Sequence, residues 1–120
     1  MNVFYSVPTV VTAVVFASTV TATPFDGLYK SEHGSWTCDP LDIGMDGGSL
    51  GIDGDFLYGL ESECELTNPT NVRGMDAILY DSICTAEGES YPSSRVMIMQ
   101  HDEGIYLIQD GSVGDWRDCT

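Results

Sequence analysis

Basic residues are scarce in this chain of 120 residues. Lys and Arg number 4 against 19 Asp and Glu, which gives a formal net charge of -15. Nucleic acids and anionic membrane surfaces carry the same sign of charge, so electrostatics disfavours both as partners. Charged residues make up only 19% of the chain and hydrophobic residues 42%. That balance is typical of a globular domain and excludes a disordered acidic tail.

The chain also lacks the pattern of long helices. No segment of ten or more residues keeps a 3.6-residue hydrophobic period without a Gly or Pro breaker. Strand-like segments instead recur about every ten residues, with turn-forming residues between them. The pattern predicts strands at 25–30, 35–38, 49–52, 56–61 extended by 64–66, 72–85 with an interruption or bulge at Gly74, 95–100, 105–110 and 114–119, with a turn at 67–70 and loops at 39–48 and 86–94. We therefore expect an all-β fold, a small antiparallel barrel or sandwich of about seven or eight strands, linked by disulfides.

Three of the predicted strands carry four apolar residues in a row, at 77–80, 96–99 and 105–108. Strict alternation would indicate one wet face, whereas continuous apolarity indicates that both faces are covered. One face belongs to the core. For the other face we expect cover from the loops 39–48 and 86–94, with a second protomer as the alternative. Met45, Met75, Met97 and Met99 are expected to fill gaps in the core.

The first segment has the features of an export signal. No charged side chain precedes Asp26, residues 10–16 are apolar except for Thr12, and Val20-Thr21-Ala22 resembles a cleavage site. The segment carries no Lys or Arg near its start, which leaves an uncleaved membrane anchor as the alternative. We expect a signal peptide at 1–22, cleaved near Ala22, and a single domain at 23–120 that is periplasmic or secreted.

The four cysteines are widely spaced and form no C-x-x-C pair, which disfavours zinc. An even number of cysteines in a short exported chain indicates disulfides. If the chain turns back antiparallel after Cys64, the turn midpoint is Gly74, which places Cys64 opposite Cys84. Cys38 and Cys119 then pair by exclusion.

Several short motifs carry a resemblance. Glu61-Ser62-Glu63-Cys64, Cys84-Thr85-Ala86-Glu87-Gly88 and a cysteine near the terminus resemble a family of small uncharacterised exported bacterial proteins with E-S-x-C, C-x-x-E-G and terminal R-C motifs. Here Asp118 separates Arg117 from Cys119. The resemblance implies a bacterial, extracytoplasmic, disulfide-bonded β-domain, and it indicates no particular activity. In size and predicted architecture alone, the chain is similar to periplasmic lysozyme inhibitors.

Motifs of catalysis are absent. The chain has no G-x-S-x-G motif, and its two histidines, His33 and His101, lie in polar segments where we expect them to be solvated. The sequence therefore predicts no catalytic residues and no enzyme activity. The weak candidates for a metal are aspartates in a Gly-rich segment, which would bind calcium if they bind any cofactor; they are Asp39, Asp42, Asp46, Asp53 and Asp55. Ordinary turn chemistry is the alternative role for them.

The acidic charge indicates binding rather than catalysis. Opposite electrostatic fields speed association, so a basic protein such as a lysozyme-like hydrolase is the partner that we expect. The alternative is a cation-binding or structural envelope protein. The sequence leaves the oligomeric state open.

Overall fold

The computed structural model describes residues 6, 8–13 and 23–120. The predicted signal peptide at 1–22 and its cleavage point at Ala22 fall mostly outside this range. Within the range, no helix is long and apolar enough to cross a membrane. The described elements are β1 (Gly27–Ser31), the 3-10 turn η1 (Pro40–Asp42), β2 (Leu50–Asp53), β3 (Phe56–Gly59), β4 (Ser62–Asn71), β5 (Ala77–Ala86), β6 (Glu89–Ser90), β7 (Ser94–His101), β8 (Gly104–Gln109) and β9 (Ser112–Asp118).

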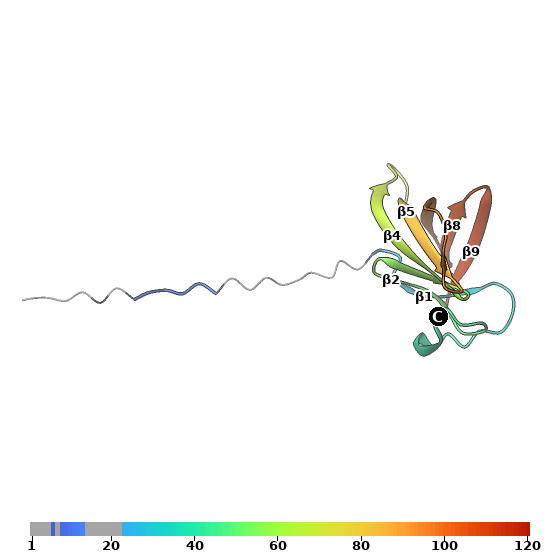
Figure 1. Cartoon of the computed structure of the whole chain (residues 1–120), viewed down its shortest axis with the longest axis horizontal. Helices are drawn as coiled ribbons and strands as arrows, with labels where there is room; N and C mark the ends of the chain where they lie inside the picture. Colours follow the sequence, from blue (N-terminus) through green and yellow to red (C-terminus); the bar gives the residue numbers. More distant parts are fainter. Residues whose placement is uncertain (1–5, 7, 14–22) are drawn as a thin grey trace, which may run out of the picture.

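Eight strands close into an antiparallel barrel, and β6 lies outside it. Figure 1 shows the curved strands of the barrel and the loop that precedes β2 below them. Successive strands pair along a meander, and the first strand pairs with the last: Tyr29 lies opposite Asp118 and Ser31 opposite Trp116. β6 adds only two residue pairs to the end of β5. The expectation of an all-β barrel or sandwich with seven or eight strands is confirmed, as a barrel. Closure leaves no long free strand edge, which protects such a sheet from edge-to-edge association.

The core fills the barrel interior with alternate residues of the strands. Val96 and Ile98 are 4% and 0% exposed, while the residues between and after them are only half-buried. This alternation follows from the two-residue period of a strand. Trp36 and Trp116 pack against the buried cluster, which consists of Phe25, Tyr29, Leu50, Ile52, Leu57, Leu66, Tyr80, Val96, Ile98 and Ile105.

Both predicted disulfides are present. Cys64 lies directly opposite Cys84 in the β4–β5 pair, with a Cα–Cα distance of 4.0 Å. The turn that joins these strands contains Gly74 in a left-handed conformation (φ 77°), as the midpoint argument requires. Cys38 and Cys119 are joined at a Cα–Cα distance of 5.7 Å. The Cys119 amide also donates a hydrogen bond to the Leu28 carbonyl, so this disulfide lies beside the β1–β9 seam that closes the barrel.

Several local predictions are wrong. Residues 35–38 form a loop, because the Thr37 and Cys38 amides bond carbonyls of the neighbouring 39–48 segment. Residues 67–70, expected as a turn, form a bulge inside β4, where Asn68 has φ 51°. A turn at Leu60–Glu61 separates β3 from β4, which the sequence joined into one strand. Residues 72–75 form the β4–β5 turn, and the predicted loop at 86–94 contains β6.

The 39–48 loop covers the outer barrel face at β2, where Ile43 packs on Gly51, and not at the three apolar strands for which cover was expected. The 39–48 loop lies against β2 and the β3–β4 turn, where Gly44 bonds Ser49 and Glu61 through its backbone. The 86–94 segment is tied to β5 through β6 and the Tyr91 amide. The methionines do not fill the core: Met45 and Met75 are 59% and 47% exposed, and Met97 and Met99 alternate with the buried residues of β7.

We predict that the Cys38–Cys119 disulfide stabilises the fold more than Cys64–Cys84 does. The sequence separations are 81 and 20, so chain-entropy theory gives about 4.5 and 3.3 kcal/mol. Replacing both cysteines of each pair by Ser in separate variants, followed by urea unfolding, measures the difference. A larger loss of the free energy of unfolding for the Cys64/Cys84 variant would contradict the view that the longer cross-link, beside the β1–β9 pair, stabilises the barrel most.

Candidate functional site

The outer surface of β3, β4 and β5 combines acids with exposed apolar side chains. In one cross-strand row, Tyr58 lies opposite Glu63, which lies opposite Thr85. In the next row, Phe56 lies opposite Glu65, and Glu65 opposite Ile83. All six side chains alternate with inward residues such as Leu57, Cys64 and Leu66, so they point away from the barrel. We call this surface the acidic face and include in it the adjoining Leu60, Glu61, Glu87 and Glu89.

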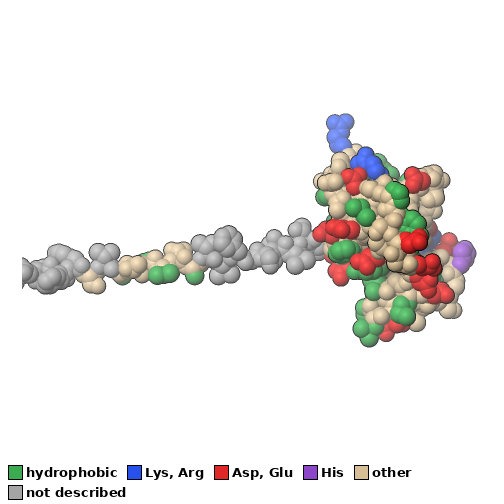
Figure 2. Space-filling model, in the orientation of Figure 1, with side chains coloured by type: hydrophobic (Ala, Val, Ile, Leu, Met, Phe, Trp, Pro, Cys, Tyr) green, Lys and Arg blue, Asp and Glu red, His purple; other side chains and the backbone are tan. Residues whose placement is uncertain are grey.

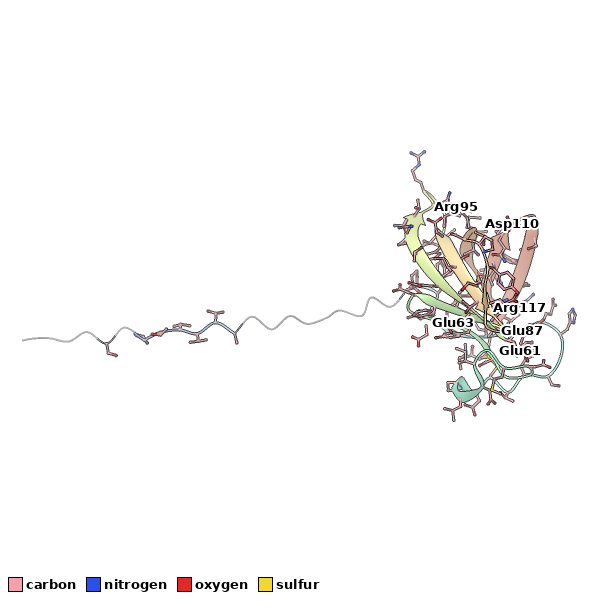
Figure 3. The ribbon with its side chains drawn as sticks, viewed as in Figure 1. Glu61, Glu63, Glu87, Arg95, Asp110 and Arg117 are labelled. Carbon is pink, nitrogen blue, oxygen red and sulfur yellow. A yellow bond between two sulfur atoms is a disulfide. The ribbon has the colours of Figure 1, made fainter. Side chains whose placement is uncertain are left out.

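Turn geometry concentrates further glutamates at one end of the acidic face. Glu61 ends the β3–β4 turn and Glu87 follows β5, and these ends lie together because Ser62 pairs with Ala86. Figure 3 labels Glu61 and Glu87, which lie side by side at the lower end of the barrel. Figure 2 shows acidic side chains spread over one side of the molecule with few basic ones among them. In the described chain, no Lys or Arg forms a salt bridge with the five glutamates of the acidic face.

The apolar members of the acidic face are accessible. Phe56, Leu60 and Ile83 are 38%, 47% and 46% exposed. The rings of Phe56 and Tyr58 lie 6.4 Å apart, centroid to centroid. Partial burial raises the pKa of Tyr58, and the charges of Glu63 and Asp53 raise it further. The acidic face therefore combines accessible aromatic and aliphatic side chains with carboxylates that form no salt bridge in the described part of the chain.

A second cluster of charged groups surrounds His101 at the end of β7. The Glu103 amide donates to Nδ1 of His101 (3.1 Å), and Nε2 lies 2.9 Å from Oδ1 of Asp115. Because Nδ1 accepts a hydrogen bond, the ring's proton lies on Nε2 and points at the carboxylate. The side chain of His101 is only 15% exposed, and its ring lies 4.3 Å from that of Tyr106. The expectation of a solvated His101 is therefore wrong.

Arg117 completes the His101 cluster. Its guanidinium contacts Asp115 twice, at 3.1 and 3.0 Å, and also pairs with Glu103. The hydrogen bonds of the His101 ring are all accounted for by Asp115 and Glu103 in the part of the chain described. Sequence reasoning missed this cluster because its members come from two segments, 101–106 and 115–117, that meet only through the pairing of β8 with β9. The side chains named in this cluster are charged or aromatic and include no Ser, Thr or Cys.

The remaining predicted site residues are scattered. His33 lies on an exposed loop, and its carbonyl accepts from the Trp36 indole at 2.9 Å. The carboxylates of Asp39 and Asp42 accept hydrogen bonds from the Leu41 amide and the Thr37 hydroxyl, which is turn chemistry. Asp46 is exposed in the same loop, whereas Asp53 and Asp55 flank the β2–β3 turn. Over residues 23–120, no three His, Cys, Asp or Glu side chains form a group that could hold a metal ion.

The barrel interior leaves little room for a ligand. Its cavity measures about 50 Å³ and is lined by Leu57, Cys64, Leu66, Ser82, Val96, Leu107 and Gln109. Small-molecule sites usually enclose about 300–1,000 Å³. The Ser82 hydroxyl, which faces this space, already bonds the Ser94 carbonyl at 3.2 Å. The barrel interior is therefore smaller than a usual small-molecule site.

No family model, no curated protein and no solved structure matches this chain. The acidic face is the largest gathering of unpaired acids with exposed apolar side chains among the surfaces described above.

We predict that Tyr29 makes the fold sensitive to alkali. Its buried hydroxyl donates to the Phe25 carbonyl. Burial, with Asp118 and Asp26 adding to it, raises the pKa from 10.0 to about 12. As the pH rises, Tyr29 therefore loses its proton in the unfolded chain before it does so in the folded one. The contribution of Tyr29 to the free energy of unfolding is complete below about pH 10 and is lost toward pH 12, at about 1.4 kcal/mol per pH unit. Urea unfolding between pH 9 and 11 measures this loss. The free energy of unfolding should fall less steeply with pH for Tyr29→Phe than for the wild type, and parallel falls would contradict this assignment.

Proposed function

We propose that this protein is a secreted or periplasmic binding protein whose acidic face engages a cationic surface on another protein. The observation that carries the proposal is the arrangement of glutamates and apolar residues across β3–β5. Glu63 lies beside Tyr58, and Glu65 lies between Phe56 and Ile83. Neither glutamate forms a salt bridge in the described chain. Desolvated apolar anchors supply affinity at an interface, while surrounding charges steer the encounter and select the partner. A lysozyme-like hydrolase with a basic surface has the matching chemistry.

Export is part of the proposal. The two disulfides are compatible with an oxidising compartment outside the cytoplasm. The signal peptide at 1–22, a bacterial source and membership of the family with E-S-x-C and C-x-x-E-G motifs remain predictions. Of the glutamates in that family's pattern, Glu61 and Glu87 belong to the acidic face, whereas Glu63 takes the pattern's variable position.

A cation-binding or structural envelope role is the weaker alternative. The five aspartates that motivated calcium lie in two separate turns, and Asp39 and Asp42 already accept hydrogen bonds there. We also propose that the protein has no catalytic activity, because the His101 ring is engaged by Asp115 and Glu103.

We predict salt-sensitive binding to a c-type lysozyme, measured by surface plasmon resonance at low and physiological ionic strength. Glu63→Gln combined with Glu65→Gln should weaken the affinity at least tenfold, mainly by slowing association. The control is Asp76→Asn combined with Asp102→Asn, which removes the same charge from exposed positions at the opposite end of the barrel.

A basic protein without a glycoside-hydrolase cleft, such as cytochrome c, separates specific binding from charge attraction alone. Equal losses in both double variants, or equal affinity for both basic proteins, would contradict a defined site on the acidic face. A third result is that lysozyme does not bind, while another basic protein binds tightly and loses affinity for the Glu63/Glu65 variant. That result would contradict lysozyme as the partner and support the acidic face as the binding site.

A further inference from the structure

A second outer surface, on β5, β7, β8 and β9, is apolar. One row crosses all four strands: Leu79 lies opposite Met97, Met97 opposite Ile108, and Ile108 opposite Val113. In the neighbouring row, Met99 lies opposite Tyr106. We call these six residues the β7–β8 face.

The side chains of the β7–β8 face point away from the core. Met97 and Met99 alternate with the buried Val96 and Ile98, and Tyr106 follows the buried Ile105. Val113 is 64% exposed, and the other five are half-buried. An antiparallel strand with one wet face normally alternates apolar and polar residues, so outward apolar residues in four adjacent strands indicate a surface that is covered in use. The loops at 39–48 and 86–94 bond to β2, to the β3–β4 turn and to β5, and therefore do not supply the cover.

Charge distinguishes this surface from the rest of the molecule. The chain carries 19 acids, but the row from Leu79 to Val113 contains none of them. In the neighbouring row, the first acid is Asp115, which lies opposite Tyr106. Both of its ends carry both signs of charge. At one end, Arg95 pairs with Asp81 at 3.3 Å. At the other, Arg117 pairs with Asp115 at 3.0 Å. Figure 3 labels Arg95 and Arg117, which lie well apart along the barrel.

We propose that the β7–β8 face binds a second copy of this chain and forms a two-fold symmetric dimer. A two-fold interface brings the same patch of both subunits together. When two copies face each other with their β7 strands antiparallel, the Arg95 end of one lies over the Asp115 end of the other, so the mixed ends are self-complementary. A cationic partner has no comparable reason to choose this face, because its centre carries no acid. The acidic faces of both subunits stay free.

Sedimentation equilibrium of the purified chain, with both disulfides formed, tests the dimer between about 10 µM and about 1 mM. We expect the apparent mass to approach twice the 13.0 kDa of one chain. Met97→Lys and Ile108→Lys should each weaken the association at least tenfold, because each buries a charge in the interface. The matched control is Ile83→Lys, which makes the same kind of change on the acidic face and should leave the dimer intact.

The methionines give a readout that needs no variant. With methyl-labelled Met, the Met97 and Met99 resonances should shift with protein concentration, while the exposed Met45 and Met75 resonances stay constant. A monomer at every concentration would overturn the proposal. A dimer that Met97→Lys and Ile108→Lys leave unchanged, or one in which Met45 and Met75 alone respond, would overturn the choice of face.

Discussion

Mutual repulsion among unpaired carboxylates is the constraint on which the rest of this structure depends. The net charge of -15 sits on a domain with four basic residues, and within residues 23–120 the arginines form salt bridges with only Glu32, Asp81, Glu103 and Asp115. Such repulsion favours expansion of the compact state. A closed barrel and two disulfides oppose it, and the longer disulfide lies beside the seam where the last strand meets the first.

The same constraint divides the barrel's outer surface into regions with different chemistry. On β3–β5 the carboxylates remain unpaired and stand between exposed apolar residues, which favours a cationic partner. On the β7–β8 face the six outward side chains are apolar and an ion pair lies at each end, which is the basis of the proposed dimer. β5 contributes to both surfaces through different residues, Ile83 and Leu79. A dimer built this way would present two acidic faces to its partners, which strengthens binding to any surface that both can reach.

The sequence predicted those features that depend on local chemistry. The separation of the strands at 49–52 and 56–61 by turn-forming residues, and the pairing of Cys64 with Cys84 across a turn at Gly74, follow from turn preferences and strand alternation. It failed where tertiary contacts override local preference, as at the bulge of 67–70 and the Leu60–Glu61 turn. The acidic face and the His101 cluster were not visible in advance, because register between strands decides which side chains meet.

The melting temperature as a function of sodium chloride tests the account most directly. Salt shortens the screening length from about 30 Å at 0.01 M to about 8 Å at 0.15 M, which weakens repulsion across the domain. If the carboxylates are unpaired and repel one another, the melting temperature at pH 7 should rise by several degrees over this range, since 1 kcal/mol corresponds to about 4–8 °C for a domain of this size. A melting temperature that is flat or falls with salt would mean that the acids are individually satisfied within the fold, and the acidic face would lose its physical reason to bind a cation.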